Sequence, residues 1–294
     1  MLILISDAFD ASLPKRLQEL GEVTDDKARL PEAEVVLIRS KTKCTKEYLD
    51  GAPKLKLIIR GGVGMDNVDM AAAKARGITA TNTPEASSVA VAELAMALMI
   101  AAPSRLIEGH NSMVEGKWLK NELKRTELYG KTLGLLGIGR IGAEVAKRAR
   151  GFDMKVIAFD PYVKSSPVAE LKSFDEVLAG SDYLSLHMPL TDETRNMVRA
   201  DTIAKMKKGV VIVNTGRGKC VDEPALAKAL QDGHVGCYAT DVWTSDPPPA
   251  DCPLLKAPRV LMTPHLGASS KENLLRIGDI VVEKIRDYKA GKKL

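Results

Sequence analysis

In Lys131-Thr-Leu-Gly-Leu-Leu-Gly-Ile-Gly-Arg-Ile-Gly142, a strand, a tight turn and the start of a helix follow one another. Residues 132–136 form a short apolar β-type segment, and residues 141–150 continue at helical spacing. The glycines at 137, 139 and 142 fit the pattern G-x-G-x-x-G. In that pattern one glycine makes the turn, one lets the backbone approach a pyrophosphate, and one allows close packing of helix on strand. The free N–H groups of the new helix then face the anion.

The acidic residue after the next strand indicates whether this glycine turn binds a dinucleotide or is only a chain turn. Lys155 to Phe159 is a second apolar strand, and it ends in Asp160, 18 residues beyond Gly142. A carboxylate there accepts a hydrogen bond from a ribose 2′-hydroxyl and repels a 2′-phosphate. Pro161 and Tyr162 come next instead of an arginine, and the nearest cation is Lys164. The sequence therefore predicts a dinucleotide site that takes NAD rather than NADP.

The bulk properties exclude several other classes of protein. A chain of 294 residues is long for one core and suits two domains. The net charge of +5 is spread out, with no basic cluster interleaved with aromatics, so nucleic-acid binding is not indicated. The segment Val89 to Ala102 is apolar but too short to span a bilayer, and it contains Glu93. We therefore expect no membrane contact.

The N-terminus and the cysteines indicate a cytoplasmic protein. Residues 1–7 lack the basic start of a signal peptide and are typical of a first buried strand. The four cysteines have neither C-x-x-C pairing nor metal-site spacing, so we expect reduced thiols and no metal; they are Cys44, Cys220, Cys237 and Cys252.

Hydrophobic patterning predicts two consecutive α/β series, each with a mostly parallel sheet covered on both faces. The expected strands are Leu2–Ile5, Val35–Ile38, Leu57–Ile59, Ile78–Thr81, Thr132–Leu136, Lys155–Phe159, Tyr183–Leu186, Val210–Asn214, Gly236–Thr240 and Val260–Met262. The expected helical segments include Leu13–Leu20, Lys46–Leu49, Met70–Arg76, a long region from Pro84 towards Gly116, and the amphipathic Ser269–Ala290. Periodicity alone leaves open whether the last helix caps the second series or returns to the first.

Three groups with acid–base or anion-binding chemistry follow strands of the second series. Arg217, between two glycines, is placed to fork onto a carboxylate. The next strand is followed by two carboxylates, Asp241 and Asp246, and the last by His265 in Thr-Pro-His-Leu-Gly. Singly, each has a plain structural explanation, such as a solvated arginine or a turn-forming aspartate. Together, at strand ends beyond a dinucleotide site, they indicate an acid–base constellation.

The other histidines are less suggestive. His110 lies in an expected helix and His234 precedes a strand, so both are expected on the surface or in packing. His187 ends a strand just before Met188-Pro189, where it is expected to shape the cofactor site rather than to carry protons.

At these residues the chain resembles the D-isomer-specific 2-hydroxyacid dehydrogenases, and within that family the short forms of D-3-phosphoglycerate dehydrogenase. The resemblance covers nearly the whole chain. Its motifs are Gly62-Val-Gly-Met-Asp-Asn-Val-Asp69, Asn82-Thr-Pro84, Val91-Ala-Glu93, Gly137–Gly142, His187-Met-Pro189, Asn214–Gly218, Asp241-Val242 and Pro264-His-Leu-Gly-Ala268.

The resemblance implies an α/β fold of two doubly wound parallel-sheet domains, with a Rossmann nucleotide domain inserted into a flavodoxin-like substrate domain. Residues 1–96, joined by 269–294, would form the substrate-binding domain, and 97–268 the NAD-binding domain. The active site is expected in the cleft between them. A homodimer is also implied, built through the nucleotide domains with the region after Pro103 reaching across.

The family's catalytic roles map onto three positions. Arg217 would bind the substrate carboxylate and keto oxygen, and His265 would donate or accept the proton. The family's usual glutamate partner of the histidine aligns with Asp246, which is one methylene shorter. Its contact with His265 is therefore expected to need a small loop shift or a water. A carboxylate beside an imidazole orients it and favours its charged form.

Cofactor and substrate positions are also implied. The cofactor set is Gly137, Gly139, Arg140, Ile141, Gly142, Asp160, His187, Met188, Pro189, Thr215, Gly216, Asp241 (on the nicotinamide amide), His265, Gly267 and Ala268. The substrate set is Arg39, Lys41, Arg60, Gly61, Gly62, Val63 and Arg217. Three cations in that set suit a second anion such as a phosphate, against the alternative of an ordinary basic surface.

The expected reaction is the NAD-dependent interconversion of a 2-hydroxy acid and its 2-keto acid. The substrate pair expected first is 3-phosphoglycerate and 3-phosphohydroxypyruvate, in serine biosynthesis. Reduction of hydroxypyruvate or glyoxylate is the alternative within the same class. An NADH-sensing corepressor-like binding protein is the alternative from another class, and Arg217 and His265 do not exclude it.

Overall fold

The computed structural model describes residues 1–294, and the chain divides into two compact units. The first comprises Met1–Ala90 and Ala268–Leu294, and the second Val91–Gly267. Each unit has one sheet in which every strand pair is parallel. The predicted pair of doubly wound parallel sheets is thereby confirmed.

The first unit has a five-stranded sheet in the order β2-β1-β3-β4-β5, which is the flavodoxin-like order. Its strands are β1 (Leu2–Ile5), β2 (Glu22–Thr24), β3 (Val35–Ile38), β4 (Leu57–Arg60) and β5 (Thr79–Asn82). Its helices are α1 (Leu13–Leu17), a 3₁₀ helix (Lys27–Glu32), α2 (Lys46–Asp50), α3 (Met70–Ala75) and α10 (Lys271–Lys289).

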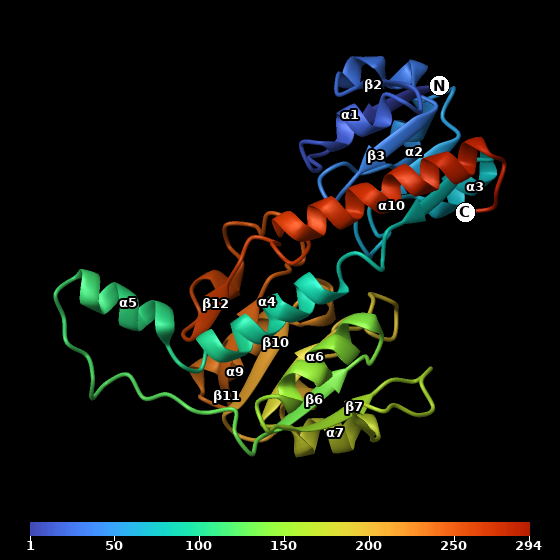
Figure 1. The fold of residues 1–294 in the computed structure, drawn as a ribbon. Coiled ribbons are helices and arrows are strands. Elements are labelled where there is room, and N and C mark those ends of the chain that lie inside the picture. Colours follow the sequence, from blue (N-terminus) through green and yellow to red (C-terminus); the bar gives the residue numbers. More distant parts are fainter. The chain divides into compact units, whose positions relative to one another are not determined.

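Two apolar clusters cover the two faces of this sheet. On one face α10 and α1 pack together, with Ile277, Val281 and Ile285 of α10 against the strands. On the other face α2 and α3 supply Leu49 and Ala73. In Figure 1 the long red helix α10 runs beside α1 and the blue strands. The last helix thus returns to the first series, which periodicity alone had left open.

The second unit has a seven-stranded sheet in the order β12-β11-β10-β9-β6-β7-β8. Its strands are β6 (Thr132–Leu136), β7 (Lys155–Phe159), β8 (Glu170–Leu171), β9 (Tyr183–Leu186), β10 (Val210–Asn214), β11 (Val235–Thr240) and β12 (Val260–Met262). The order reverses between β6 and β9, and open α/β sheets bind ligands at such a switch point.

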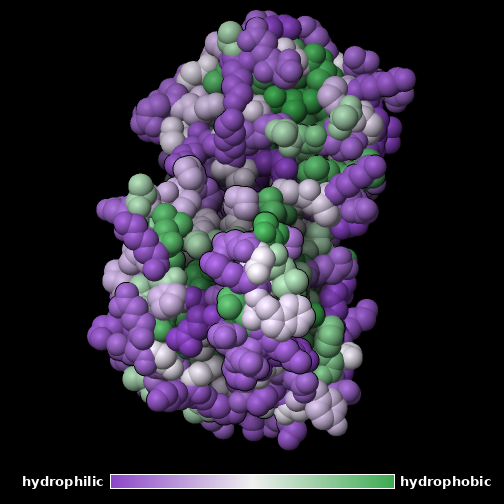
Figure 2. Space-filling view, turned by 90° about the vertical axis from the view of Figure 1, so that its left-hand side faces the viewer, coloured by the Kyte–Doolittle hydropathy of each residue, from purple (hydrophilic) through white to green (hydrophobic).

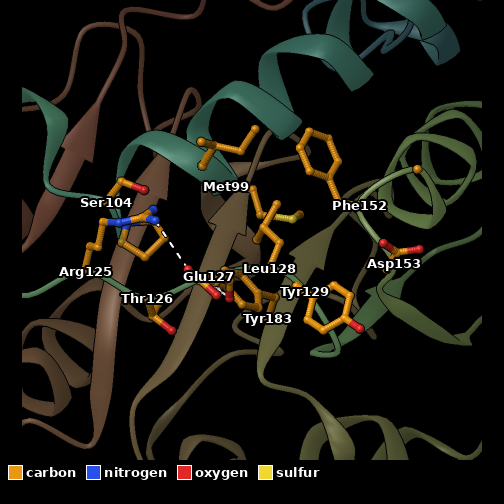
Figure 3. Close-up of a pocket in the computed structure, with 13 residues that line it drawn as sticks. Met99, Ser104, Arg125, Thr126, Glu127, Leu128, Tyr129, Phe152, Asp153 and Tyr183 are labelled. Atoms are coloured by element: carbon orange, nitrogen blue, oxygen red, sulfur yellow. Dashed lines mark hydrogen bonds and ion pairs between the residues drawn. The ribbon is translucent and has the colours of Figure 1, made fainter.

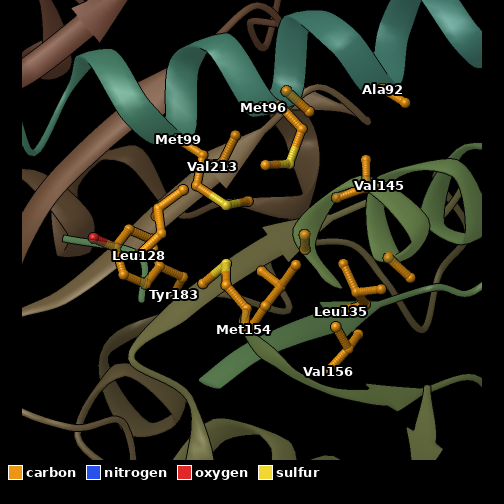
Figure 4. Close-up of a cluster of buried hydrophobic side chains, with 14 of the residues drawn as sticks. Ala92, Met96, Met99, Leu128, Leu135, Val145, Met154, Val156, Tyr183 and Val213 are labelled. Atoms are coloured by element: carbon orange, nitrogen blue, oxygen red, sulfur yellow. The ribbon is translucent and has the colours of Figure 1, made fainter. Parts of the chain in front are cut away.

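Helices cover both faces of this second sheet as well. They are α4 (Ser88–Ala101), α6 (Arg140–Arg150), α7 (Phe174–Gly180), α8 (Ala200–Ile203) and α9 (Glu223–Gln231), with 3₁₀ turns at Gly218–Cys220 and Pro253–Leu255. The helix α5 (Leu106–Val114) follows α4 and adds no side chain to either apolar core of this unit. Figure 4 shows one of the two cores, where Ala92, Met96 and Met99 of α4 face Leu135 and Val145.

Several predicted elements need correction. The helical region expected from Pro84 towards Gly116 begins only at Ser88 and breaks after Ala101. The break contains Pro103, which lacks an N–H and disfavours helix at the residue before it, and Arg105, with a left-handed φ of 54°. The helix expected to Leu20 ends at Leu17, and the short strands β2 and β8 were not predicted.

No single helix is long and apolar enough to cross a membrane. The bent pair α4 and α5, with 62° between them, passes such a test together by length and composition only. Much of α4 is buried in the core shown in Figure 4.

Candidate active site

In the turn after β6, each of the three glycines has a different structural role. Gly137 has a left-handed φ of 92°, and a Cβ on it would meet the backbone of His187 at 2.9 Å. A Cβ on Gly142 would lie 2.3 Å from the carbonyl oxygen of Gly137, so only glycine lets the helix pack this close. A Cβ on Gly139 would meet no atom within 4 Å, and that side of the turn is open. The turn thus has the tight, open and close-packed glycines of a pyrophosphate site.

Asp160 supports this turn through its carboxylate. One oxygen accepts from the N–H of Ile138 at 3.0 Å, and the other accepts from the N–H of Tyr162 at 3.0 Å. The turn is also tied to β7, because the N–H of Gly137 donates to the Phe159 carbonyl at 2.9 Å. Asp160 therefore lies at the turn, where the ribose contact is expected. That contact itself stays a prediction.

Two buried polar atoms without a hydrogen-bond partner follow the neighbouring strands β9 and β10. They are Nδ1 of His187 and Oγ1 of Thr215. Burial lowers the pKa of His187 to about 4, so the imidazole is uncharged at neutral pH. Its Nε2 is 2.8 Å from the hydroxyl of Ser185. Orphaned polar atoms beside an open glycine turn fit a dinucleotide that would supply their partners.

The remaining predicted cofactor residues differ in exposure. Arg140 opens α6 and is exposed, whereas Ile141 is partly buried. Met188 is buried and Pro189 is exposed. Gly216 is buried, and a Cβ on it would lie 2.9 Å from the Leu186 carbonyl oxygen.

The loop that carries Arg217 is held by Asn214, the last residue of β10. Asn214 is fully buried; its Nδ2 donates to the Arg217 carbonyl at 3.0 Å, and its Oδ1 accepts from the Gly216 N–H at 3.0 Å. The guanidinium of Arg217 donates to the Gly216 carbonyl at 2.8 Å. Asn214 has this supporting role, which the sequence reasoning missed although an Asn-Thr-Gly at a strand end was a usable signal.

His265 and Asp246 are in direct contact. Nδ1 of His265 lies 2.5 Å from Oδ2 of Asp246, and the side chains are 33% and 42% exposed. Although aspartate is one methylene shorter than the family's usual glutamate, Asp246 reaches His265 directly, and the contact needs no bridging water. Because Nδ1 faces the carboxylate, Nε2 is the ring atom left for a substrate.

Arg217, Asp241 and His265 follow three adjacent parallel strands, β10, β11 and β12. The register pairs Asn214 with Thr240 and Thr240 with Met262, so the three strands end at one edge of the sheet. Asp241 itself is 1% exposed, and its carboxylate accepts from the N–H groups of Leu266 and Gly267. Its nicotinamide contact stays a prediction.

In the first unit, the predicted substrate residues follow β3 and β4. The loop after β4 is tight: Gly62 has a φ of 153°, and a Cβ on it would lie 2.3 Å from Nη1 of Arg60. Its N–H donates to Oγ1 of Thr83 at 3.0 Å, and the Val63 carbonyl accepts from Asn82. A Cβ on Gly61 would lie 2.6 Å from the Phe9 ring. This packing fixes the backbone that is expected to meet a substrate carboxylate.

The three cations of this unit differ in their surroundings. Arg39 donates to the carbonyls of Ala8 at 3.4 Å and Ala268 at 2.9 Å, its Nε is buried without a partner, and burial lowers its pKa. Arg60 donates through Nε to Asn67 at 3.3 Å, and Lys41 is exposed. The two guanidiniums therefore also brace the loops of this unit.

Asp7 is a supporting residue that the sequence reasoning missed. Its carboxylate accepts from the N–H groups of Arg39 at 2.6 Å and Thr42 at 3.0 Å, and from the Thr42 hydroxyl at 2.7 Å. A carboxylate two residues after β1 was the available signal.

A cavity of about 380 Å³ lies elsewhere in the second unit, and no predicted site residue lines it. Figure 3 shows its lining, with Met99 of α4 above Leu128 and Tyr183 and with Phe152 to one side. Leu128 precedes β6 and Tyr183 begins β9, so the cavity is at the edge of the sheet opposite the glycine turn. No group of three or more His, Cys, Asp or Glu side chains is arranged to hold a metal ion.

Comparison with known proteins identifies the family. Residues 96–267 match the family model of the D-isomer specific 2-hydroxyacid dehydrogenase, NAD binding domain. The chain is 46% identical to the hydroxypyruvate reductase of Thermotoga maritima, over 87% of this chain and 85% of that protein. It is 41% identical to the D-3-phosphoglycerate dehydrogenase of Methanocaldococcus jannaschii, over 99% of this chain but only 58% of that protein.

The solved structures agree. The D-lactate dehydrogenase of Aquifex aeolicus, complexed with NAD and lactic acid, matches with a TM-score of 0.89 and 30% identity, over 99% of this chain and 97% of that one. The chain spans about half the length of the phosphoglycerate dehydrogenases that it matches. Residues 96–267 are an NAD-binding domain, and the chain belongs to the family of D-isomer specific 2-hydroxyacid dehydrogenases.

Proposed function

We propose that this protein is an NAD-dependent dehydrogenase that interconverts a D-2-hydroxy acid and its 2-keto acid. The observation that carries the proposal is the direct pair of His265 and Asp246, at the sheet edge that also carries Arg217. An acid–base pair and a carboxylate-binding arginine are the groups that such a reaction requires. The first unit serves as the substrate-binding domain and the second as the NAD-binding domain.

The residues have distinct tasks in the reduction of the keto acid. NADH, when bound by the open glycine turn and the groups after β9 and β10, supplies the hydride. Arg217 holds the substrate carboxylate and stabilises the negative charge that develops on the keto oxygen. His265 delivers the proton to that oxygen from Nε2, while Asp246 accepts from Nδ1 and keeps the ring oriented. In the oxidative direction the neutral imidazole takes the proton back.

For the substrate we propose 3-phosphoglycerate and 3-phosphohydroxypyruvate. Support comes from the cations Arg39, Lys41 and Arg60, which follow or end neighbouring strands of the first unit, and from the relatives named D-3-phosphoglycerate dehydrogenase. Gly61, Gly62 and Val63 would meet the carboxylate through their backbone. Hydroxypyruvate is the second candidate, because the Thermotoga maritima relative named for its reduction is covered over 85% of its length.

A panel of acids tests the proposal. NADH oxidation is followed with 3-phosphohydroxypyruvate, hydroxypyruvate, glyoxylate and pyruvate, and kcat/KM is compared. Preference for the phosphorylated acid supports the first substrate, and preference for hydroxypyruvate supports the second. Tight NADH binding without turnover of any acid would refute the enzyme and favour an NADH-sensing protein.

Substitution of the arginine separates substrate binding from cofactor binding. Arg217→Ala is expected to lower kcat/KM by at least about 10³-fold, because both the carboxylate and the oxyanion lose a charged partner. NADH affinity, measured by fluorescence titration, should remain within a few fold of wild type. Parallel loss of NADH affinity and turnover would mean that Arg217 supports the fold instead.

We further propose a homodimer in the cytoplasm. Exposed apolar side chains gather in α5 and just after it, at Leu106, Ile107, Met113, Val114 and Trp118, which are between 53% and 74% exposed. Figure 2 shows this side of the molecule, with green apolar side chains among purple hydrophilic ones. Exposed apolar groups of this number in one segment favour a protein partner. The cytoplasmic assignment rests on four buried cysteines, none of them in a disulfide.

A further inference from the structure

The buried carboxylate of Asp241 accepts three hydrogen bonds from the loop that carries His265. Asp241 is 1% exposed and follows β11 directly. Its Oδ1 accepts from the Thr263 hydroxyl at 2.6 Å and from the Leu266 N–H at 2.7 Å, and its Oδ2 accepts from the Gly267 N–H at 2.8 Å. All three donors lie in residues 263–267, on both sides of His265.

The backbone of His265 needs such a restraint. Its φ is 57°, in the left-handed region that residues with a Cβ disfavour. A residue stays in that region only when its surroundings hold it there. Because the three bonds to Asp241 bracket His265, they fix the conformation that points Nδ1 at Asp246.

Trp243 supplies a second anchor for the same loop. Its indole Nε1 donates to the Thr263 carbonyl at 3.2 Å, two residues before His265. Its backbone also packs on the loop of the catalytic arginine, since a Cβ on Gly218 would lie 2.0 Å from the Trp243 carbonyl carbon. The segment that begins at Asp241 therefore contacts both the Arg217 loop and the His265 loop.

We propose that Asp241, through Thr263 and with Trp243 as second anchor, is the positioning residue of His265. In this role its carboxylate acts on the reaction through the imidazole, apart from any contact with the nicotinamide. The inference rests on the proposed function, in which His265 moves the proton.

Thr263→Val is the decisive variant, because it removes one donor to Asp241 and keeps the shape of the side chain. We expect kcat to fall roughly tenfold with hydroxypyruvate or 3-phosphohydroxypyruvate, and NADH affinity and KM to stay within about twofold. Trp243→Phe should act in the same direction. Asp241→Asn, whose amide nitrogen cannot accept a hydrogen bond and so leaves one of the two loop N–H groups without an acceptor, should lower kcat by about 10²-fold, as expected for a misplaced catalytic group.

Thr202→Val is the matched control. The Thr202 hydroxyl is also buried in the second unit and donates to the Met197 carbonyl at 2.8 Å, outside the site. This variant should lose stability and keep kcat. A Thr263→Val enzyme with unchanged kcat overturns the proposal. So does a loss of turnover that saturating NADH restores, because Asp241 and Thr263 would then act on the cofactor.

A readout that needs no turnover separates this inference from the proposed function. The imidazole N–H of His265, donated to Asp246, should give a downfield proton signal in NMR spectra of the wild type and of Thr202→Val. That signal should weaken or move in Thr263→Val. If no acid is turned over, the proposed function fails, yet this comparison still decides whether Asp241 positions the ring; an unchanged signal in Thr263→Val would show that it does not.

Discussion

Two glycines of the turn after β6 have different surroundings, so one alanine variant should lose stability and the other should lose NADH affinity. A methyl group at Gly142 would lie 2.3 Å from a backbone oxygen, so Gly142→Ala should lose about 1–3 kcal/mol of unfolding free energy as the helix is forced away. A methyl group at Gly139 meets nothing within 4 Å, and its φ of −64° suits alanine. Gly139→Ala should keep its stability and bind NADH at least about tenfold more weakly, because the methyl group occupies the pyrophosphate approach.

Urea unfolding and NADH titration of the two variants measure this difference. Equal stability of the two proteins would contradict the packing role of Gly142. Normal NADH affinity of Gly139→Ala would show that the pyrophosphate does not approach on that side.

His187 makes the stability of the protein depend on pH. Burial lowers its pKa to about 4, whereas the unfolded chain takes up the proton near 6.5. Between these values the unfolded state binds more protons, so the contribution of His187 is present above pH 6.5 and is lost as the pH falls towards 4. The loss should amount to about 2–3 kcal/mol. The free energies of unfolding of wild type and His187→Gln, measured with urea at several pH values between 7 and 4, should converge as the pH falls.

A difference in free energy of unfolding that stays constant over this range would contradict the lowered pKa.

At the residue scale, the sequence predicted the residues of the candidate site, but it did not predict which side chains hold the loops that carry them. The glycine pattern, Asp160 and the triplet of Arg217, Asp246 and His265 are visible as residue types at strand ends. The bonds of Asn214 and Asp7 to loop backbone are not, because they depend on how each loop folds back. For Asp246 the side-chain length was readable, whereas the direct contact with His265 follows from the backbone on either side.

The helix α10 stabilises the first unit although it is the last element of the chain. Ile285 is fully buried in the cluster with α1 and the strands, whereas Leu275 of the same helix is 40% exposed. Ile285→Ala should therefore cost about 2–4 kcal/mol of unfolding free energy, and Leu275→Ala less than about 1 kcal/mol. Thermal unfolding of both variants tests this. Similar losses would mean that α10 does not pack on the first unit.

At the element scale, the sequence was most informative where a strand has a continuous apolar run. β1, β3, β6, β7, β9, β10 and β12 have the bounds that their apolar runs predict. The missed strands, β2 and β8, are edge strands of three and two residues with partly exposed side chains, so they lack an apolar run. The break between α4 and α5 was missed although Pro103 and the polar residues Ser104 and Arg105 interrupt the apolar run there.

At the scale of the whole molecule, the exposed apolar side chains in and just after α5 favour association of the chain with a second copy. If α5 lies in a homodimer interface, Val114→Glu, at a residue 74% exposed in the single chain, should give a monomer by light scattering. Leu275→Glu is the control, because it places the same charge at an exposed apolar position of α10 in the first unit. It should leave the mass of the particle unchanged.

Trp118 reports on the same interface. The chain has two tryptophans, Trp118 and Trp243, and Trp118 is 73% exposed in the single chain. In a Trp243→Phe background, emission of Trp118 should be blue-shifted at high protein concentration, where dimerisation removes it from water, and should shift to the red in Val114→Glu. A wild-type chain that is monomeric at all concentrations, with solvent-exposed Trp118 emission throughout, would leave the apolar side chains of α5 to another partner.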